Sequence, residues 1–65
     1  MNTKTKETVQ LTGQDGNVFA IIGAVTTALR RAGHMALAVE FRERAFTAED
    51  YDAVLRLCCE YVEVQ

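Results

Sequence analysis

The stretch "NVFAIIGAVTTALRRAG", residues 17–33, decides the fold because it has the pattern of one complete helix with both ends marked. Asn17, or alternatively Asp15, can accept hydrogen bonds from the N–H groups of a first turn. Gly33 follows Arg30 and Arg31, and a glycine after a basic last turn is typical of a helix end. Apolar residues recur on one face at helical spacing: Val18, Ile21, Ile22, Val25, Leu29 and Ala32. We therefore predict a helix from Val18 to about Ala32 that buries this face.

The opposite side of this helix is made of small residues. They are Ala20, Gly23, Ala24 and Thr27. Small side chains let two helices approach closely, and a two-fold dimer uses one such patch against its own copy. We therefore expect these four residues to contribute to an interaction surface.

A second, shorter helix is predicted over Met35–Ala45. One face of it suits a core: Leu37, Ala38, Phe41 and Ala45. The reverse side is not cleanly polar, because Met35, Val39 and Phe46 fall together there beside Arg42 and Glu43. A helix that is apolar on two sides is usually sandwiched or in contact with a partner. Met35, Val39, Arg42 and Phe46 are therefore candidate interaction residues.

The third helix is predicted to begin at "TAED", where Thr47 would cap it and Glu49 and Asp50 would lie in its first turn. Its expected core face is Tyr51, Val54, Leu55, Cys58 and Val62. The end is ambiguous, because Tyr61–Val64 continues the helical period as far as Val62 but also alternates like a strand. We favour a short strand or extended tail that pairs with "VQLT", residues 9–12.

The N-terminal part predicts a strand over Thr8–Thr12, where Val9 and Leu11 alternate with polar residues, after a disordered tail over residues 1–6. The following "GQDGN" lacks the lysine of a phosphate loop and the ligand set of a calcium loop, so it is interpreted as a turn. The fold class expected for the single domain over residues 1–65 is α+β, a small three-helix domain with an N-terminal strand paired to the C-terminal tail.

Composition narrows the function classes. The 65 residues carry a net charge of −2, with four arginines between Asn17 and Phe46 and five acids from Thr47 onward. Cys58 and Cys59 are adjacent and cannot staple distant segments, and one histidine offers no zinc site. No export signal or membrane span is visible, and free thiols suit the cytoplasm. We expect no metal, no cofactor and no membrane partner.

An enzyme is not expected, because the sequence has neither a base–nucleophile pair nor a cofactor loop. Two helices joined by a glycine turn leave open a helix-turn-helix module that binds nucleic acid. Against this alternative, the outer face of the second helix carries Glu43 beside Arg42, and the domain is acidic overall. The leading expectation is a small protein that works through protein–protein contact, with itself as a homodimer or with another protein, since it has more apolar side chains than so short a chain buries alone.

Two segments carry a family resemblance: "VQLTGQDGNVFAIIGAVTTALRRAG" and "EDYDAVLRLCCEYVEV". The chain resembles short, uncharacterised bacterial and phage-borne proteins with an LTGxDGNxFxIxG start and a DYDxxL…YVxV end. The resemblance implies an intracellular protein encoded on a phage or mobile element, and it implies no activity. The middle segment, "HMALAVEFRERAF", is less polar than in that group, so the surface of the second helix is the more distinctive feature.

Overall fold

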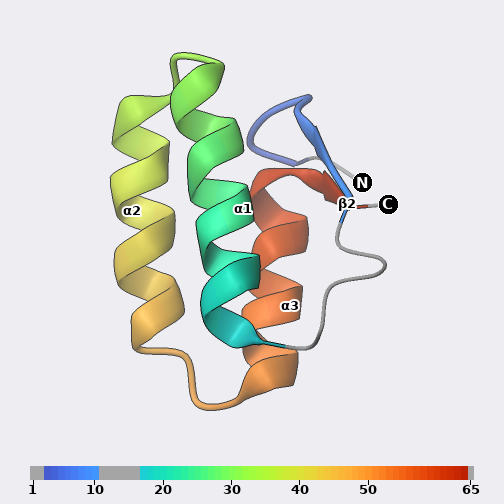
Figure 1. Ribbon diagram of the computed structural model, residues 1–65, viewed down its shortest axis with the longest axis vertical. Helices are drawn as coiled ribbons and strands as arrows, with labels where there is room; N and C mark the ends of the chain where they lie inside the picture. Colours follow the sequence, from blue (N-terminus) through green and yellow to red (C-terminus); the bar gives the residue numbers. More distant parts are fainter. Residues whose placement is uncertain (1–2, 11–16, 65) are drawn as a thin grey trace.

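The computed structural model describes residues 3–10 and 17–64. Its elements follow in the order β1 (Thr8–Val9), α1 (Val18–Arg31), α2 (Met35–Phe46), α3 (Tyr51–Tyr61) and β2 (Glu63–Val64). The three helices pack side by side into a bundle, and the short strand pair lies beside it (Figure 1). This arrangement confirms the predicted α+β class with three helices and paired end segments.

Both predicted ends of α1 are confirmed. The Asn17 side chain accepts a hydrogen bond from the N–H of Phe19 at 2.9 Å. At the other end Gly33 has φ +85°, its N–H donates to the Arg30 carbonyl at 3.0 Å, and the His34 N–H donates to the Leu29 carbonyl at 2.8 Å. These two hydrogen bonds, together with a glycine in the left-handed conformation, are a common way for a helix to end. The predicted turn before α1 falls on residues 11–16, which lie outside the described part.

The core lies where the three helices meet. Its buried side chains from α1 are Ile21, Ile22, Val25 and Leu29, and those from α2 are Ala38, Phe41 and Ala45. Phe41 packs edge-on against Tyr61 of α3, with ring centroids 5.3 Å apart. The expected apolar stripe of α1 is thus confirmed except at Ala32, which is exposed beyond the last turn.

The start of α3 corrects the sequence prediction. Thr47 does not cap α3, because it lies four residues before Tyr51, where that helix begins; it is the C-cap of α2, and its hydroxyl donates to the Arg44 carbonyl at 3.0 Å. Asp50 is the N-cap instead, and its carboxylate accepts from the Ala53 N–H at 2.7 Å. A side chain caps a helix from the position directly before its first residue, and Asp50 occupies that position.

The buried face of α3 also differs from the expected one. Val54, Leu57, Cys58 and Tyr61 are buried, and Val62 follows them into the core. Tyr51, predicted as a core residue, is 42% exposed, because α3 begins at this residue and its first turn lies at the end of the bundle. Leu55 is half-buried at the edge.

The two ends of the chain pair as favoured from the sequence. Thr8 lies opposite Glu63 and Val9 opposite Val64, and the strands are parallel. Parallel strands need a long crossover connection, which the three helices supply here. The predicted extension of the first strand to Thr12 lies partly outside the described residues, and β1 itself ends at Val9.

The segment before β1 differs from the expected tail. The N–H groups of Lys4 and Thr5 donate to the carbonyls of Glu60 and Tyr61, at 2.8 and 3.1 Å. Thr5 is buried, and its hydroxyl donates to the Tyr61 carbonyl at 2.7 Å. Residues 3–6 therefore lie against the last turn of α3, where they satisfy carbonyls that a helix end leaves without partners.

Candidate functional site

The candidate site is an exposed apolar surface along α1 and α2. The predicted interaction residues Met35, Val39 and Phe46 are 53%, 58% and 50% exposed, in line along α2. Phe19, at the start of the antiparallel neighbour α1, is 66% exposed. We call this surface the α1/α2 face and define it by eight residues: Phe19, Gly23, Thr26, Arg30, Met35, Val39, Arg42 and Phe46. A contiguous row of large exposed apolar side chains usually marks a contact surface.

One end of the face is aromatic. The rings of Phe19 and Phe46 lie with their centroids 5.8 Å apart and tilted by 42°, which joins α1 to α2 outside the core. The Arg42 guanidinium lies over the Phe46 ring, 5.2 Å from its centroid. Stacking of this kind holds an arginine flat while its N–H groups stay available to a partner.

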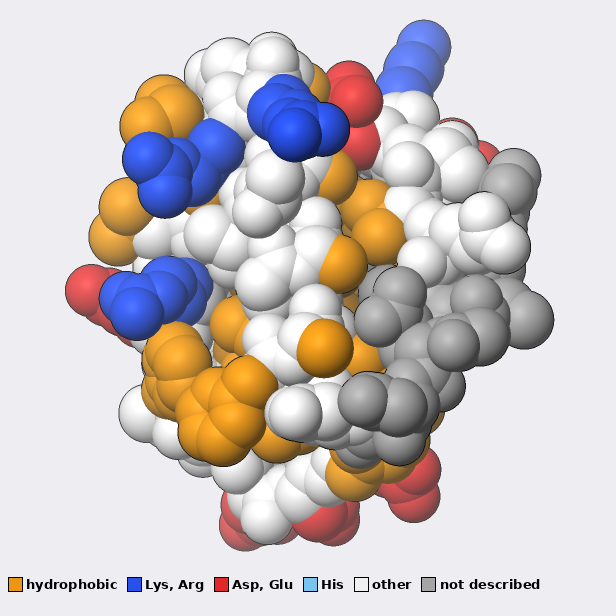
Figure 2. All heavy atoms as spheres, viewed as in Figure 1, with side chains coloured by type: hydrophobic (Ala, Val, Ile, Leu, Met, Phe, Trp, Pro, Cys, Tyr) orange, Lys and Arg blue, Asp and Glu red, His pale blue; other side chains and the backbone are white. Residues whose placement is uncertain are grey.

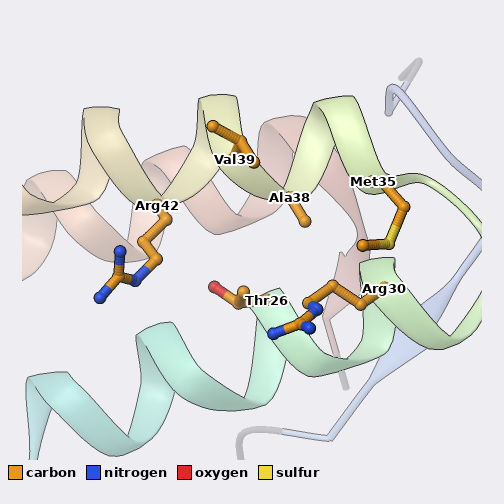
Figure 3. Close-up of a pocket in the computed structure, with 6 residues that line it drawn as sticks. All are labelled: Thr26, Arg30, Met35, Ala38, Val39 and Arg42. Carbon is orange, nitrogen blue, oxygen red and sulfur yellow. The ribbon is translucent and has the colours of Figure 1, made fainter.

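A groove of about 410 Å³ runs between the two helices in the middle of the face. Figure 3 shows Thr26 and Arg30 on the α1 side and Met35, Val39 and Arg42 on the α2 side, with Ala38 behind them. The Thr26 hydroxyl oxygen is buried and has no hydrogen-bond partner in the described part of the protein. Next along α1, a side chain added at Gly23 would meet open space, so the groove is not closed there.

A second hollow, of about 310 Å³, lies at the aromatic end of the face. It is lined by Val18, Phe19, Phe46, Ala48 and Tyr51, and Asp50 is its one acidic residue among the described lining. The hollow is therefore an apolar recess with a carboxylate at its border. Such recesses receive single protruding side chains of a partner.

The small residues predicted as an interaction surface fall into two places. Ala20 and Gly23 are exposed on α1, and Gly23 belongs to the α1/α2 face. Ala24 and Thr27 line a different hollow, of about 340 Å³, beside Glu7 at the start of β1. The structure therefore brings Met35, Val39, Arg42 and Phe46 together with Gly23, but it directs Ala24 and Thr27 toward the strand side of α1.

Charge is unevenly distributed over the molecule. Lysine and arginine side chains lie mainly toward the end where α1 meets α2, while acidic ones gather at the end where α2 meets α3 and also lie beside the basic ones (Figure 2). At the first end Arg30 and Arg31 occupy the last turn of α1, and at the second Glu49 and Asp50 precede α3. The α1/α2 face thus has a basic end beside Met35, and beside Phe46 it carries Arg42 with the carboxylate of Asp50 at its border.

The remaining polar groups have structural roles. Burial raises the pKa of the Cys58 thiol to about 11, and the neighbouring Cys59 adds to this rise. Burial also raises the pKa of Tyr61, although the hydrogen bond that Arg44 donates to its hydroxyl at 3.1 Å acts in the opposite direction. A thiol and a phenol held neutral in this way are poor nucleophiles near pH 7. His34 precedes α2 and forms no side-chain cap bond.

Sequence reasoning missed Phe19, Thr26 and Arg30 as members of the face. Of these three, only Phe19 could have been predicted from the sequence, because an aromatic residue that lies outside the buried stripe of its helix is expected to be exposed. Thr26 and Arg30 carry no comparable signal, since their role depends on how α2 lies against α1. Their placement needed the structure.

Comparisons with protein-family models, with curated protein sequences and with solved structures give no match. Over the described ranges, no helix combines the length and the apolar content that crossing a bilayer requires. Within the same ranges, no three His, Cys, Asp or Glu side chains come together as a metal site would need. We therefore infer the function from the geometry of the α1/α2 face.

Proposed function

We propose that this chain is a small non-enzymatic protein that acts through protein–protein contact, with the α1/α2 face as its contact surface. The observation that carries the proposal is the joint exposure of four large apolar side chains, each at least half exposed: Met35 and Val39 at the groove, and Phe19 and Phe46 at the aromatic hollow. Scattered exposed apolar residues need no explanation, but a contiguous set on two packed helices does.

The energetics support this assignment. A large apolar side chain is stabilised by about 1.5–3 kcal/mol when it is fully buried. Because the four side chains are about half exposed in the isolated chain, covering them with a partner would contribute roughly 3–6 kcal/mol to the free energy of association. Arg42, held flat on the Phe46 ring, adds a directed donor at the centre of the same surface. Aromatic residues and arginine are the types most enriched at protein interfaces.

A nucleic-acid-binding role receives less support from the arrangement of the helices. In a helix-turn-helix the two helices cross at a wide angle, so that the second can enter the major groove. Here α1 and α2 lie side by side and antiparallel over most of their length (Figure 1). The exposed side of α2 mixes apolar side chains with two arginines and two glutamates, whereas phosphate contacts would need a row of cations.

The compartment we propose is the cytoplasm. Cys58 and Cys59 are both free thiols, one buried and one exposed. Free thiols persist in a reducing compartment, whereas secreted domains of this size commonly use disulfides.

Site-specific photocrosslinking in the source cell tests the proposed contact surface. A photoreactive amino acid replaces Val39 in the centre of the α1/α2 face. In a matched control it replaces Arg56, an exposed residue of α3 that lies outside this face, in a hollow between α2 and α3. We expect a crosslinked polypeptide, either a second copy or another protein, from the Val39 position and not from Arg56. Absence of any crosslinked polypeptide from Val39, with the protein folded and expressed, would refute the proposed function.

A further inference from the structure

We propose that the α1/α2 face is covered by a second copy of the same chain, related by a two-fold axis that sets the two copies antiparallel. This inference rests on the proposed function, because it names the partner of the same face. It is carried by the charge, the shape and the size of that face.

The two ends of the face differ in charge. Arg30 lies in the last turn of α1 and lines the groove together with Met35, whereas the far end carries Asp50 at the border of the aromatic hollow as well as Arg42 over the Phe46 ring. A two-fold rotation across the face places Arg30 of each copy near Asp50 of the other, so that the same attraction forms twice. A parallel arrangement would instead oppose Arg30 to its own copy.

The shape of the face is complementary to itself in the same arrangement. Met35 projects at the basic end, and the recess of about 310 Å³ next to Phe46 lies at the other. These two residues are about 16 Å apart along α2, at the usual rise per residue. In the antiparallel pair each Met35 reaches the recess of the partner copy, where its sulfur would lie against the rings of Phe19 and Tyr51. Contacts between methionine sulfur and aromatic rings are favourable and tolerate an imperfect fit.

The available area suits a weak dimer. At the usual rise per residue α1 and α2 are about 21 and 18 Å long, and at about 10 Å across each they give a face of about 400 Å² per copy. Two such faces bury about 800 Å² in total, which is in the range of weak, transient interfaces. We therefore expect dissociation in the micromolar range, so the dimer forms as the protein becomes concentrated. An acidic helix from another protein would fit Arg30 and Arg42 but would meet Asp50 with like charge.

Sedimentation equilibrium of the full chain from about 1 µM to about 1 mM tests the dimer over the affinities expected for this area. We expect the mass to rise from 7.2 kDa toward twice that value. In this arrangement Val39 faces Arg42 of the partner copy, so Val39→Arg opposes two cations at two places near the two-fold axis and should keep the chain monomeric over the whole range. Arg30→Glu and Asp50→Asn should each raise the dissociation constant about tenfold. The asparagine keeps the helix cap, so its effect reports charge and not folding.

Arg56→Glu is the matched control, because it makes the same charge change on an exposed residue outside the face. It should change the dissociation constant by less than about twofold. Circular dichroism of every variant confirms that the helices remain formed. Dimerisation that Val39→Arg does not weaken would overturn the assignment to this face.

The antiparallel arrangement is tested by disulfide trapping in a Cys59→Ser background. A mixture of Met35→Cys and Phe46→Cys chains should form a mixed disulfide dimer in preference to either self-linked dimer. Self-linked Met35→Cys as the main product would overturn the arrangement. A chain that stays monomeric at about 1 mM would overturn the homodimer. If photocrosslinking from Val39 then still captured another protein, the proposed function would stand; if it captured nothing, both proposals would fall.

Discussion

Replacing Thr5 with valine tests whether the N-terminal segment is part of the folded unit. Thr5 is 6% exposed, and its hydroxyl donates to the Tyr61 carbonyl at 2.7 Å while it accepts from the Glu7 N–H at 3.2 Å. Valine keeps the shape of threonine and removes both hydrogen bonds. The Tyr61 carbonyl retains the bond from the Thr5 N–H, but the half-buried Glu7 N–H loses its partner.

The expected cost is about 1–3 kcal/mol, from one lost hydrogen bond and one donor left without a partner. A 65-residue chain has a total stability of only about 3–10 kcal/mol. Because about 1 kcal/mol shifts the melting temperature of so small a domain by about 4–8 °C, Thr5→Val should melt about 4–24 °C below the wild type.

The assay is thermal and urea unfolding followed by circular dichroism, at one fixed protein concentration so that self-association does not contribute. Thr8→Val is the control, because Thr8 is exposed on β1 and undergoes the same chemical change. We expect Thr8→Val to unfold like the wild type. If Thr5→Val did the same, within about 0.3 kcal/mol, then the first residues would not be docked on α3 and the reasoning would be refuted.

Four further predictions concern single positions. Asp50→Ala should destabilise the protein by about 1 kcal/mol through loss of the α3 cap, whereas Thr47→Ala should cost less. Equal losses of stability in urea unfolding would contradict the assignment of Asp50 as the cap. Gly33→Ala should lower the stability by about 1–2 kcal/mol, because φ is +85° there, although the added Cβ meets no atom within 4 Å. An unchanged melting temperature would contradict this expected backbone strain. Cys59 should react rapidly with a thiol reagent at pH 8 and Cys58 slowly, with Cys59→Ser lacking the fast phase. Since burial raises the Cys58 pKa from 9.0 to about 11, the unfolded chain loses this proton first, and stability should fall between those pH values, less so in Cys58→Ala.

Local signals made the helices predictable from the sequence. The Asn17 cap, the periodic apolar residues and the left-handed Gly33 all belong to one short segment, so both ends of α1 could be inferred from it. The choice between Thr47 and Asp50 as the α3 cap could not be made in this way. It depends on where α3 begins, and in the structure Thr47 belongs to the end of α2, where its hydroxyl donates to carbonyls of the last turn.

The docking of the N-terminal segment had no local signal. Lys4 and Thr5 sit in a polar run that resembles a tail, and their partners are the Glu60 and Tyr61 carbonyls at the other end of the chain. Contacts between residues so far apart in sequence leave no periodic pattern in either segment.

The candidate site was partly predictable for a related reason. Met35, Val39, Arg42 and Phe46 lie on one helix, so the helical period alone placed them on a common side. Phe19, Thr26 and Arg30 joined them only once the antiparallel packing of α1 on α2 was known. That packing also separated Ala24 and Thr27 from the same surface.

The most direct measurement of the central claim is the rate at which peroxide oxidises Met35, read from its peptide by mass spectrometry. Oxidation of methionine follows its exposure, and Met35 is 53% exposed in the isolated chain. We expect fast oxidation in dilute purified protein, and oxidation slower by about fivefold or more in fresh extract of the source cell, where the α1/α2 face is covered. Equal rates in the two samples, with added free methionine oxidised equally in both, would contradict the claim that this surface works by contact with another polypeptide.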